Sequence, residues 1–298
     1  MEKSFDTTIL THSQVQQNVA LSEHISFRLG GSARTFVLLD ERDAPSALRE
    51  LRASGVKYAF LGNGTNVLVR DDGFDGVIIK LKSTPPQICG NRITVSAGTS
   101  LAVTAQAAAE HSLTGLEFAH GIPGTVGGAV MMNAGAYGGE IKDVLVSAKY
   151  CTPSGDVLEL NGAELGFGYR TSFFKVHPEY LILSAEFELR QGDRDEIKNT
   201  MAELARRRRE SQPLDKPSAG STFKRPEGYF AGKLIEDCSL KGCTIGGAQV
   251  SRKHAGFVIN AGGATCSDVL ELCDHIQKTV YERFGVTLER EIKILGEE

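Results

Sequence analysis

Two glycine-rich segments of the sequence could hold an anionic ligand through backbone groups. The first, GNGTN, covers residues 62–66. Backbone N–H groups in such a turn can converge on an anion, and Thr65 and Asn66 add side-chain donors. The segment lacks the lysine of a Walker A loop and has no helix after it, so neither common nucleotide fingerprint applies. An ordinary hairpin turn explains it about equally well.

The second segment, GIPGTVGGAVMMNAGAYGG, lies in a region of residues 115–139 that holds eight glycines and no Lys or Arg. Pro123 stiffens its entry, and Gly124, Gly127 and Gly128 leave the first turn of a predicted helix without side chains. Free N–H groups and the positive helix end would then face a ligand, and a diphosphate fits them. Close packing of backbone against backbone is the alternative, at a cost in chain entropy. Together, the two segments favour a large phosphate-bearing cofactor in the N-terminal two thirds.

The last third of the chain supplies side-chain chemistry. Ser221 follows Gly220 on a predicted turn, without the G-x-S-x-G elbow of a hydrolase and without a histidine in a motif. A nucleophilic role is therefore improbable, while a proton donor and a plain turn residue both remain open. Glu289 and Glu291 are two residues apart on a predicted closing strand, so both face one side of it.

Two further features of the sequence are a single arginine among apolar residues and a run of four arginines. Arg170 follows Tyr169 among glycines and apolar residues, and an arginine in such surroundings usually binds a carboxylate or phosphate. The run at residues 206–209 fans around all faces of a predicted helix, so it cannot form one nucleic-acid-binding stripe. A solvated helix end is the favoured interpretation, because cations are stabilised near a helix C-terminus. One of the four could still steer an anionic substrate.

Composition limits the possible functions. The 298 residues carry 33 basic and 37 acidic side chains, a net charge of −4, which argues against a general nucleic-acid or anionic-membrane binder. We find no signal-peptide pattern and no apolar run of membrane-spanning length. The six cysteines form no CxxC pair, which favours structural thiols over a disulfide framework or a metal site. We therefore expect a cytoplasmic protein with no metal and no membrane insertion.

The elements that must position these groups alternate between short strands and helices. The patterns predict helices over 43–55 (capped by Asp43), 100–111 (capped by Ser100), 193–210, 233–237 and 267–284. They predict strands over 58–61, 67–69, 77–79, 93–97, 144–150, 181–190, 257–260 and 288–295, with a further strand near Ile245. A strand, a glycine turn and a second strand differ from the strand, turn and helix of a Rossmann unit. Pro213, Pro217 and Gly220 mark the clearest linker.

Eight segments, in order, carry a resemblance to a known family. They are FRLGGSA (27–33), LGNGTNVLVRDDGFDGVII (61–79), HGIPGTVGGAVMMNAGAYGGEI (120–141), YRTSFF (169–174), AGSTFKRP (219–226), AGKLIEDCSLKG (231–242), HAGFVIN (254–260) and LEREIKILG (288–296). In these the chain resembles the UDP-N-acetylenolpyruvoylglucosamine reductases, flavoenzymes of peptidoglycan precursor synthesis. Only about thirty residues separate Lys175 from Arg206, so it resembles the shorter form, which lacks an inserted tyrosine-bearing loop.

The resemblance implies an α+β fold. It consists of the FAD-binding fold of the vanillyl-alcohol oxidase and p-cresol methylhydroxylase type, with two α+β subdomains, and a C-terminal α+β substrate-binding domain. The corresponding boundaries are residues 1–84, 85–212 and 213–298. The implied ligands are FAD, bound non-covalently, NADPH as hydride donor, and UDP-N-acetylglucosamine enolpyruvate as substrate.

Site residues follow from the same resemblance. The catalytic set is Arg170, Ser221 and Glu291. The cofactor-binding set is Leu61, Gly62, Asn63, Gly64, Thr65, Asn66, Gly98, Gly121, Ile122, Pro123, Gly124, Thr125, Gly127, Gly128 and Ala134. The substrate-binding set is Tyr169, Lys224, Lys233 and Asn260.

The implied reaction gives each catalytic residue a role. Hydride passes from NADPH to the flavin and then to the enolpyruvyl group, Arg170 and Glu291 stabilise the charge that develops there, and Ser221 delivers the proton. Two other functions stay open. An oxidase on the same fold would need neither Ser221 nor the C-terminal glutamate, and a non-catalytic nucleotide-binding module would use the glycine segments alone.

Overall fold

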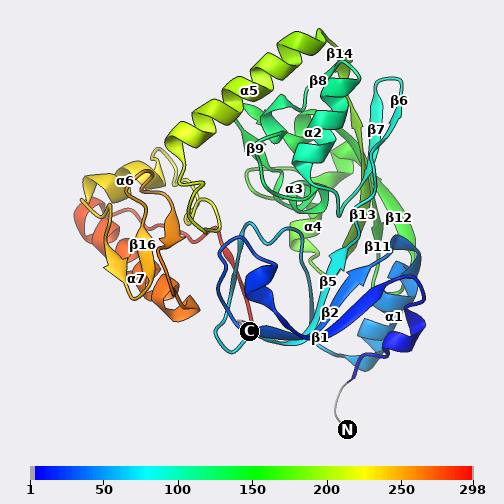
Figure 1. Ribbon diagram of the computed structural model, residues 1–298, viewed down its shortest axis with the longest axis horizontal. Coiled ribbons are helices and arrows are strands. Elements are labelled where there is room, and N and C mark those ends of the chain that lie inside the picture. The colour runs from blue at the N-terminus through cyan, green and yellow to red at the C-terminus, as the bar shows by residue number, and fades with distance from the viewer. Residues whose placement is uncertain (1–3, 297–298) are drawn as a thin grey trace. The chain divides into compact units, whose positions relative to one another are not determined.

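The computed structural model describes residues 4–296, shown as a ribbon in Figure 1. The chain forms two compact units. Unit 1 consists of Met1–Gln16, Thr35–Asn63 and Gly76–Arg208, and unit 2 of Gln17–Arg34, Gly64–Asp75 and Arg209–Glu298. The division into residues 1–84, 85–212 and 213–298 that the resemblance implies stays a prediction.

The first eighty residues build a four-stranded sheet of order β1-β2-β5-β3. Its strands are β1 (Gln14–Ala20), β2 (Ser32–Leu39), β5 (Phe74–Leu81) and β3 (Tyr58–Phe60). Strand β3 lies parallel to β5, with Tyr58 opposite Val77. The connection between β2 and β3 is helix α1 (Ala44–Ser54), which ends at Gly55 in the left-handed conformation, as predicted.

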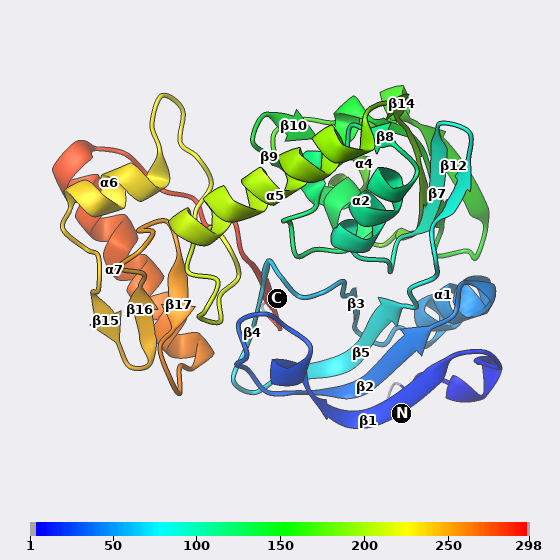
Figure 2. The same cartoon turned by 45° about the horizontal axis from the view of Figure 1, so that its top comes forward.

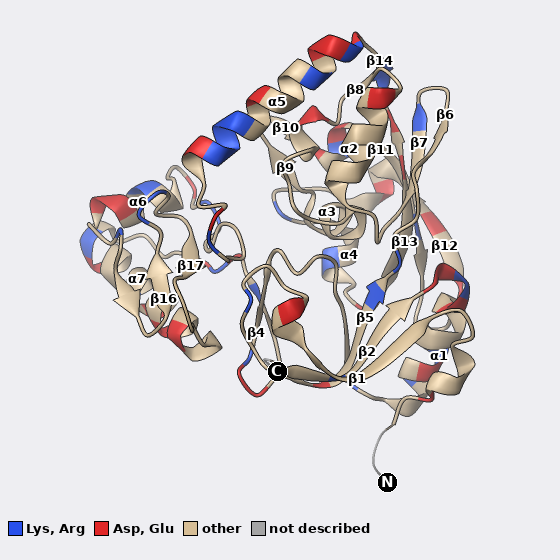
Figure 3. Ribbon diagram, viewed as in Figure 1, with Lys and Arg blue, Asp and Glu red and all other residues tan. Residues whose placement is uncertain are grey.

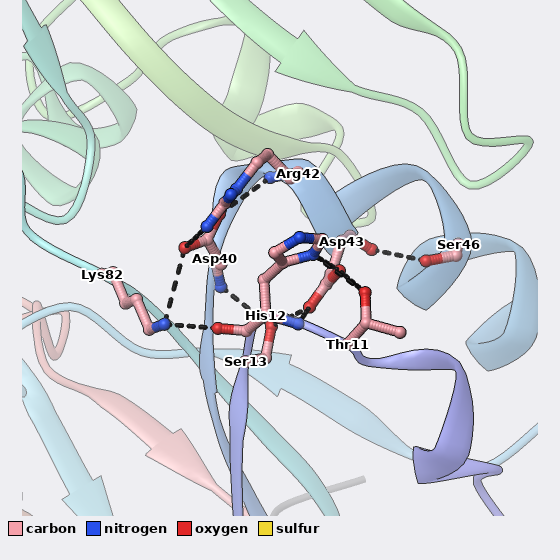
Figure 4. A network of polar contacts seen from close by, with 8 residues as sticks. All are labelled: Thr11, His12, Ser13, Asp40, Arg42, Asp43, Ser46 and Lys82. Carbon is pink, nitrogen blue, oxygen red and sulfur yellow. Dashed lines mark hydrogen bonds and ion pairs between the residues drawn. The ribbon is translucent and has the colours of Figure 1, made fainter.

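Asp43 precedes α1 but does not cap it, which corrects the prediction. Its side chain makes no cap hydrogen bond and instead accepts hydrogen bonds from His12 and Ser13, as Figure 4 shows. Burial opposes ionisation of this carboxyl, but the hydrogen bonds from Ser13 and His12 outweigh it and lower the pKa of Asp43 to about 2. The carboxylate therefore ties the segment before β1 to the start of α1.

Unit 1 also contains a five-stranded antiparallel sheet of order β12-β11-β13-β7-β6. Its strands are β12 (Val157–Asn161), β11 (Leu145–Cys151), β13 (Leu181–Glu188), β7 (Arg92–Ser96) and β6 (Gln87–Cys89). The helices of this part are α2 (Leu101–Glu110), α3 (Val126–Met132), α4 (Phe173–Val176) and α5 (Arg194–Ser211). The short pairs β9 (Gly135–Ala136) with β10 (Gly139–Glu140) and β8 (Leu113–Thr114) with β14 (Arg190–Gln191) complete it. One core of buried apolar residues joins these elements.

Local signals explain the helices of unit 1. Ser100 caps α2, its hydroxyl accepting a hydrogen bond from the N–H of Val103 at 3.2 Å, as predicted. Asp193 accepts the N–H groups of Asp195 and Glu196 at 2.9 Å each and so caps the long polar helix α5. The 3₁₀ turns of the described chain lie at Thr7–Ile9, Leu21–Glu23, Glu41–Asp43, Glu117–Ala119, Ile141–Asp143 and Gly162–Leu165.

Unit 2 combines a three-stranded antiparallel sheet with two helices, seen in Figure 2. Its elements are β15 (Thr244–Ile245), β16 (Ala248–Val250), β17 (Val258–Asn260), α6 (Ala231–Asp237) and α7 (Cys266–Phe284). A capping box of Thr265 and Asp268 starts α7, and left-handed Gly285 ends it. Strands β4 (Val67–Val69) and β18 (Lys293–Leu295) form a separate parallel pair.

Two sequence interpretations fail in physical detail. The GNGTN turn does not close a hairpin, because β3 pairs with β5 whereas β4 pairs with β18. The closing strand is shorter than predicted, since only Lys293–Leu295 forms a strand, and Arg290 makes a single bridge to Phe223. The alternation of residue types predicted a strand in this segment correctly, but it did not predict which of its residues pair with another strand.

None of the six cysteines forms a disulfide, and burial raises the pKa of Cys151 to about 11 and of Cys273 to about 12, which leaves these two thiols protonated and inert. Among residues 4–296, no helix combines the length and the apolar character needed to cross a membrane.

Candidate functional site

Gly62 and Asn63, at the start of the first glycine-rich segment, contact the second segment within unit 1. The side-chain amide of Asn63 donates a hydrogen bond of 3.0 Å to the carbonyl of Pro123. Gly62 lies so close to Thr125 that a Cβ on Gly62 would be 2.5 Å from the Thr125 hydroxyl oxygen. A side chain cannot occupy that position, so this approach requires glycine. Segments sixty residues apart in the chain therefore form one surface.

The first turn of α3 does not offer free donors, which corrects the prediction made from its glycines. The N–H groups of Val126 and Gly127 donate to the carbonyls of Thr99 and Ala97 at 2.8 and 2.9 Å. The N–H of Gly128 donates to the hydroxyl of Thr125 at 3.3 Å. A Cβ on Gly127 would lie 2.9 Å from that of Ala97, so close packing is the reason for this glycine.

The GNGTN turn is different. Within residues 4–296, no group accepts a hydrogen bond from the backbone N–H of any residue from 62 to 66. The carbonyl oxygens of Gly64 and Asn66, in contrast, accept from the N–H groups of Ser26 and Lys293. The N–H groups of this turn are therefore the backbone donors that a ligand can use.

Arg208 adds a cation to this part of unit 1. It belongs to the run of four arginines at residues 206–209 of α5, and Figure 3 shows Lys and Arg of that helix in blue. Its guanidinium donates to the carbonyl of Gly121. The Nε of Arg208 and the Nδ1 of His120 are buried atoms with no hydrogen-bond partner in the described chain. Burial lowers the pKa of Arg208 because it disfavours the charged guanidinium, and an anionic ligand beside the guanidinium would offset that cost.

The sequence interpretation of residues 206–209 missed this residue. Arg206 and Arg207 both pair with Glu203 at 2.8 Å on the exposed face, as a solvated helix end predicts. Ile197 and Met201 are the buried residues of α5, and Arg208 continues the same helical face seven residues after Met201. The periodicity of the helix could therefore have singled it out.

The remaining predicted cofactor residues of unit 1 hold the backbone in place. The N–H of Leu61 bonds to Ile79, that of Ile122 to Ala119, and that of Ala134 to Ala129, while the carbonyl of Gly124 accepts from Leu101. A Cβ on Gly98 would lie 2.3 Å from the carbonyl oxygen of Leu81, which makes glycine necessary there. These residues give the surface its shape.

Arg170 occupies a tight turn at the other end of α3. Gly168 and Thr171 exchange backbone hydrogen bonds of 3.1 and 3.3 Å, which places Tyr169 and Arg170 at the tip. The φ angle of Arg170 is +54°, in the left-handed region that costs a residue with a side chain about 1 kcal/mol. The turn is fixed to α3, because Asn133 donates to the carbonyl of Gly168 and Ser172 to that of Met131. Strain of this kind often marks a functional site.

The segments that carry Ser221 and Glu291 pair with each other in unit 2. Phe223 pairs with Arg290 in an antiparallel bridge, the N–H of Glu291 donates to the carbonyl of Thr222 at 2.9 Å, and the N–H of Lys224 donates to that of Glu289 at 2.8 Å. We call these paired segments, residues 221–224 and 289–291, the serine ladder. Ser221 is exposed and follows left-handed Gly220. The side chain of Asn66 donates to the carbonyl of Glu291 at 3.1 Å, so the GNGTN turn is attached to the ladder.

The predicted substrate residues already have partners. Lys224 pairs with Glu289 at 2.6 Å and Lys233 with Asp237 at 2.6 Å, and the latter pairing raises the pKa of Lys233. The Asn260 side chain donates to the carbonyl of Phe27 at 3.3 Å and accepts from the N–H groups of Gly262 and Ala264. The structure assigns Asn260 a structural role, and its contact with substrate stays a prediction, as does that of Tyr169.

Comparison with known proteins identifies both parts of the chain. Residues 34–161 match the family model of an FAD binding domain. Residues 212–295 match the model of the C-terminal domain of UDP-N-acetylenolpyruvoylglucosamine reductase. These matches confirm FAD as the cofactor and the predicted α+β FAD-binding fold with its C-terminal domain.

Curated relatives and a solved structure agree over almost the full length. UDP-N-acetylenolpyruvoylglucosamine reductase of Caldanaerobacter subterraneus is 49% identical over 97% of this chain and 96% of its own. That of Clostridium novyi is 47% identical over 98% of this chain and 95% of its own. The crystal structure of the Thermus caldophilus reductase matches with a TM-score of 0.81 and 35% identity, covering 95% of this chain and 99% of that one.

Proposed function

The chain belongs to the UDP-N-acetylenolpyruvoylglucosamine reductase family, and on that premise we propose that it reduces UDP-N-acetylglucosamine enolpyruvate to UDP-N-acetylmuramate with NADPH as the hydride donor. When bound, FAD supplies the hydride relay between the two substrates. The protein must then hold both reactants, stabilise negative charge on the reacting group and deliver one proton.

The observation that carries this proposal is the serine ladder. The exposed Ser221 directly precedes Thr222, whose carbonyl accepts the N–H of Glu291, and this pairing of the two segments supports the proposal. Hydride addition to the terminal carbon of the enolpyruvyl group leaves negative charge on the adjacent carbon. A serine is a weak acid, but it can protonate so strong a base when the geometry is fixed. We assign this proton transfer to Ser221.

Charge on the substrate carboxylate requires a second group. Arg170 offers a planar guanidinium on a strained turn, and such a fork binds a carboxylate through two parallel hydrogen bonds. We assign it to the enolpyruvyl carboxylate, where it stabilises the charge that spreads into that group during reduction. Glu291 is assigned to the same enediolate-like oxygens as a hydrogen-bonding partner.

We assign FAD to the surface where the two glycine segments meet. The N–H groups of the GNGTN turn can bind a diphosphate, and the unpartnered Nε of Arg208 can donate to an anionic or carbonyl oxygen of the cofactor. Binding is non-covalent, because no cysteine lies in either segment, and His120 contributes a buried ring rather than an attachment point. Acid precipitation should therefore release all yellow colour into the supernatant.

The decisive experiment follows the two half-reactions separately under anaerobic conditions. NADPH should bleach the flavin of the purified protein, and UDP-N-acetylglucosamine enolpyruvate should then restore its absorbance with formation of UDP-N-acetylmuramate. Reoxidation by oxygen alone, with no response to this substrate, would indicate an oxidase on the same fold. Six cysteines that form no disulfide support a cytoplasmic location for the reaction.

A further inference from the structure

Helix α3 connects two places in unit 1 that the proposed reaction uses. Its N-cap residue, Thr125, lies against Gly62 on the surface assigned to FAD. Its C-terminal end is bonded, through Asn133, to the turn that carries Arg170. The helix has seven residues, which corresponds to a rise of about 10 Å. The side chain at its C-terminal end therefore helps to set where Arg170 lies relative to that surface.

Asn133 ends α3 in a conformation that glycine would adopt more easily. The residue is 2% exposed and has a φ angle of +43°, in the left-handed region. Glycine is the usual residue at such a helix end, and asparagine is a less frequent one. Ending the helix therefore does not require an amide, so the buried amide of Asn133 must be explained by its contacts.

The amide of Asn133 makes three hydrogen bonds that allow only one orientation of the group. Its Nδ2 donates to the carboxylate of Glu140 at 3.0 Å and to the carbonyl of Gly168 at 3.1 Å. Its Oδ1 accepts the N–H of Lys142 at 3.1 Å. Carboxylate and carbonyl oxygens can only accept and a backbone N–H can only donate, so a flipped amide would lose all three bonds. The amide is thus a fixed link between the turn of Arg170 and the segment after β9.

An ionised carboxylate, that of Glu140, helps to hold this amide in place. The ammonium group of Lys142 lies 2.7 Å from a carboxylate oxygen of Glu140. This hydrogen bond is the main cause that lowers the pKa of Glu140, against the opposing effect of burial. The hydrogen bond from Asn133 and the positive charges of Lys142 and Arg170 lower the pKa further. The carboxylate that accepts from the amide is therefore the same group on which the charge of Arg170 acts.

Two further contacts hold the turn at residues 168–171. The hydroxyl of Ser172, which is 1% exposed, donates to the carbonyl of Met131 on α3 at 2.8 Å. The ammonium group of Lys175 donates to the carbonyl of Arg170 at 2.8 Å. Both contacts come from residues that follow Arg170 in the chain, whereas the amide at the helix end holds the turn before it. Such placement matters, because a shift of about 1 Å in a catalytic group can cost about a hundred-fold in rate.

We propose that Asn133 is a positioning residue for Arg170, and that its amide holds the turn so that the guanidinium meets the substrate carboxylate. This inference rests on the proposed function, which assigns Arg170 to that carboxylate, and it adds the group that places the guanidinium. Asn133 acts through Arg170 and not on the substrate. Its effect should therefore disappear once Arg170 can no longer make a two-point contact.

The test compares two substitutions at Asn133 in the FAD-loaded protein by anaerobic stopped flow. Asn133→Asp keeps the size of the side chain and an acceptor for Lys142, but it cannot donate to Gly168. Asn133→Gly keeps the left-handed helix end and removes the amide. Each should slow reoxidation by the enolpyruvyl substrate about ten- to a hundred-fold. Flavin reduction by NADPH should stay within about twofold of the parent rate, since the proposed function gives Arg170 no part in it.

A double-mutant cycle separates positioning from a general loosening of unit 1. In an Arg170→Lys background, Asn133→Asp should slow reoxidation by less than about twofold more, because the two-point contact that the amide serves is already lost. A substitution that merely loosens the fold would slow reoxidation by the same factor in both backgrounds.

Asn91 supplies the matched control in unit 1. Its amide likewise donates to a glutamate carboxylate, that of Glu188 at 3.2 Å, and to a backbone carbonyl, that of Leu189 at 3.3 Å. These bonds connect the start of β7 with the end of β13 and involve no residue of α3 or of the turn of Arg170. Asn91→Asp should therefore leave both half-reactions at the parent rates.

Three results would overturn the inference. They are parent rates in both Asn133 variants, equal slowing of the two half-reactions, and a loss that multiplies in full with that of Arg170→Lys. If Asn133→Asp does not fold, Asn133→Gly decides alone, in the parent and in the Arg170→Lys background. The proposed function is judged separately, by whether the enolpyruvyl substrate reoxidises the reduced parent protein. A parent that passes that test while the Asn133 variants react normally retains its function and refutes the role of the amide.

Discussion

The two units place their polar groups by opposite means. In unit 1 the geometry comes from unusual backbone: Gly62 packs against Thr125, and Arg170 adopts a positive φ angle. In unit 2 the serine ladder is ordinary antiparallel pairing, and Ser221 projects from it as an exposed side chain. The difference implies that a side chain of the ladder can be shortened without moving the backbone. Changes around Gly62 and Arg170 alter conformation as well as chemistry.

The ladder provides the largest expected effect. Ser221→Ala should slow reoxidation of the reduced protein by substrate about 10²–10⁴-fold, the usual loss for a general acid, and leave the NADPH half-reaction nearly intact. Stopped-flow absorbance of the flavin measures both rates. If substrate reoxidised the variant at the parent rate, Ser221 would be a turn residue and not the proton donor.

The neighbouring hydroxyl is the control for that change. Thr222 is buried, and its hydroxyl accepts the N–H of Val258 at 2.9 Å. Thr222→Val should lower the free energy of unfolding by about 1–3 kcal/mol, because it leaves the N–H of Val258 unsatisfied. It should not slow one half-reaction more than the other. A selective loss of substrate reduction in this variant would show that the ladder acts through its backbone and not through Ser221.

Arg170 offers the corresponding test in unit 1, where chemistry and conformation can be separated. Arg170→Lys should slow substrate reduction about a hundred-fold more than flavin reduction, because an ammonium group cannot reproduce a two-point carboxylate contact. Arg170→Gly should lose the same step and yet gain up to about 1 kcal/mol of stability, because glycine tolerates the left-handed conformation. Thermal unfolding and stopped-flow rates measured on both variants distinguish the two effects. Equal slowing of both half-reactions would place Arg170 in the cofactor site or the fold.

Sequence reasoning succeeded where a local signal fixes the structure. Ser100, Asp193 and Gly55 cap their helices as their residue types predict. It failed where tertiary contacts decide. Thr99 and Ala97 occupy the donors at the start of α3, so glycine there serves packing. The Asp43 carboxylate likewise accepts hydrogen bonds from His12 and Ser13 instead of capping its own helix. These donors lie on a segment about thirty residues earlier in the chain, so no local pattern predicts the contact.

The site could be predicted in part. Its residue types and the two glycine segments are visible in the sequence, but their contact through Asn63 and Pro123 depends on how the strands pair. Helical periodicity could have singled out Arg208 in the run of four arginines, but its contact with Gly121 is specified only by the fold. Pairing of the residues after Ser221 with the segment of Glu291 joins Phe223 to Arg290, far apart in the sequence, which no local pattern specifies.

Arg208 and Arg207 are neighbours in the sequence, but only Arg208 is assigned to the cofactor, so the two residues form a matched pair for testing FAD binding. Arg208→Met should weaken FAD binding by about tenfold or more, since a charge-assisted hydrogen bond is lost from a buried position. Arg207→Met should change it little, because an exposed pair with Glu203 contributes at most about 1 kcal/mol. Recovery of flavin fluorescence on dilution measures FAD release from each protein. Parent-like retention of FAD by Arg208→Met would confine that residue to packing against Gly121.

The smallest effect on the reaction is expected for Asp43, which contributes stability and no chemistry (Figure 4). Its pKa is lowered in the folded protein to about 2, so the charged carboxylate stabilises the fold above the unfolded pKa of about 4. That contribution amounts to about 2 kcal/mol at neutral pH and declines as the pH falls from about 4 toward 2. Asp43→Asn should therefore lower the free energy of unfolding by about this amount at pH 7 and leave both half-reactions unchanged. The gap between the parent and the variant should narrow steadily below pH 4. Urea titrations at pH 7, 5 and 3.5 measure it, and a gap independent of pH would mean that Asp43 stabilises the N-terminal segment by packing and hydrogen-bond shape rather than by its charge.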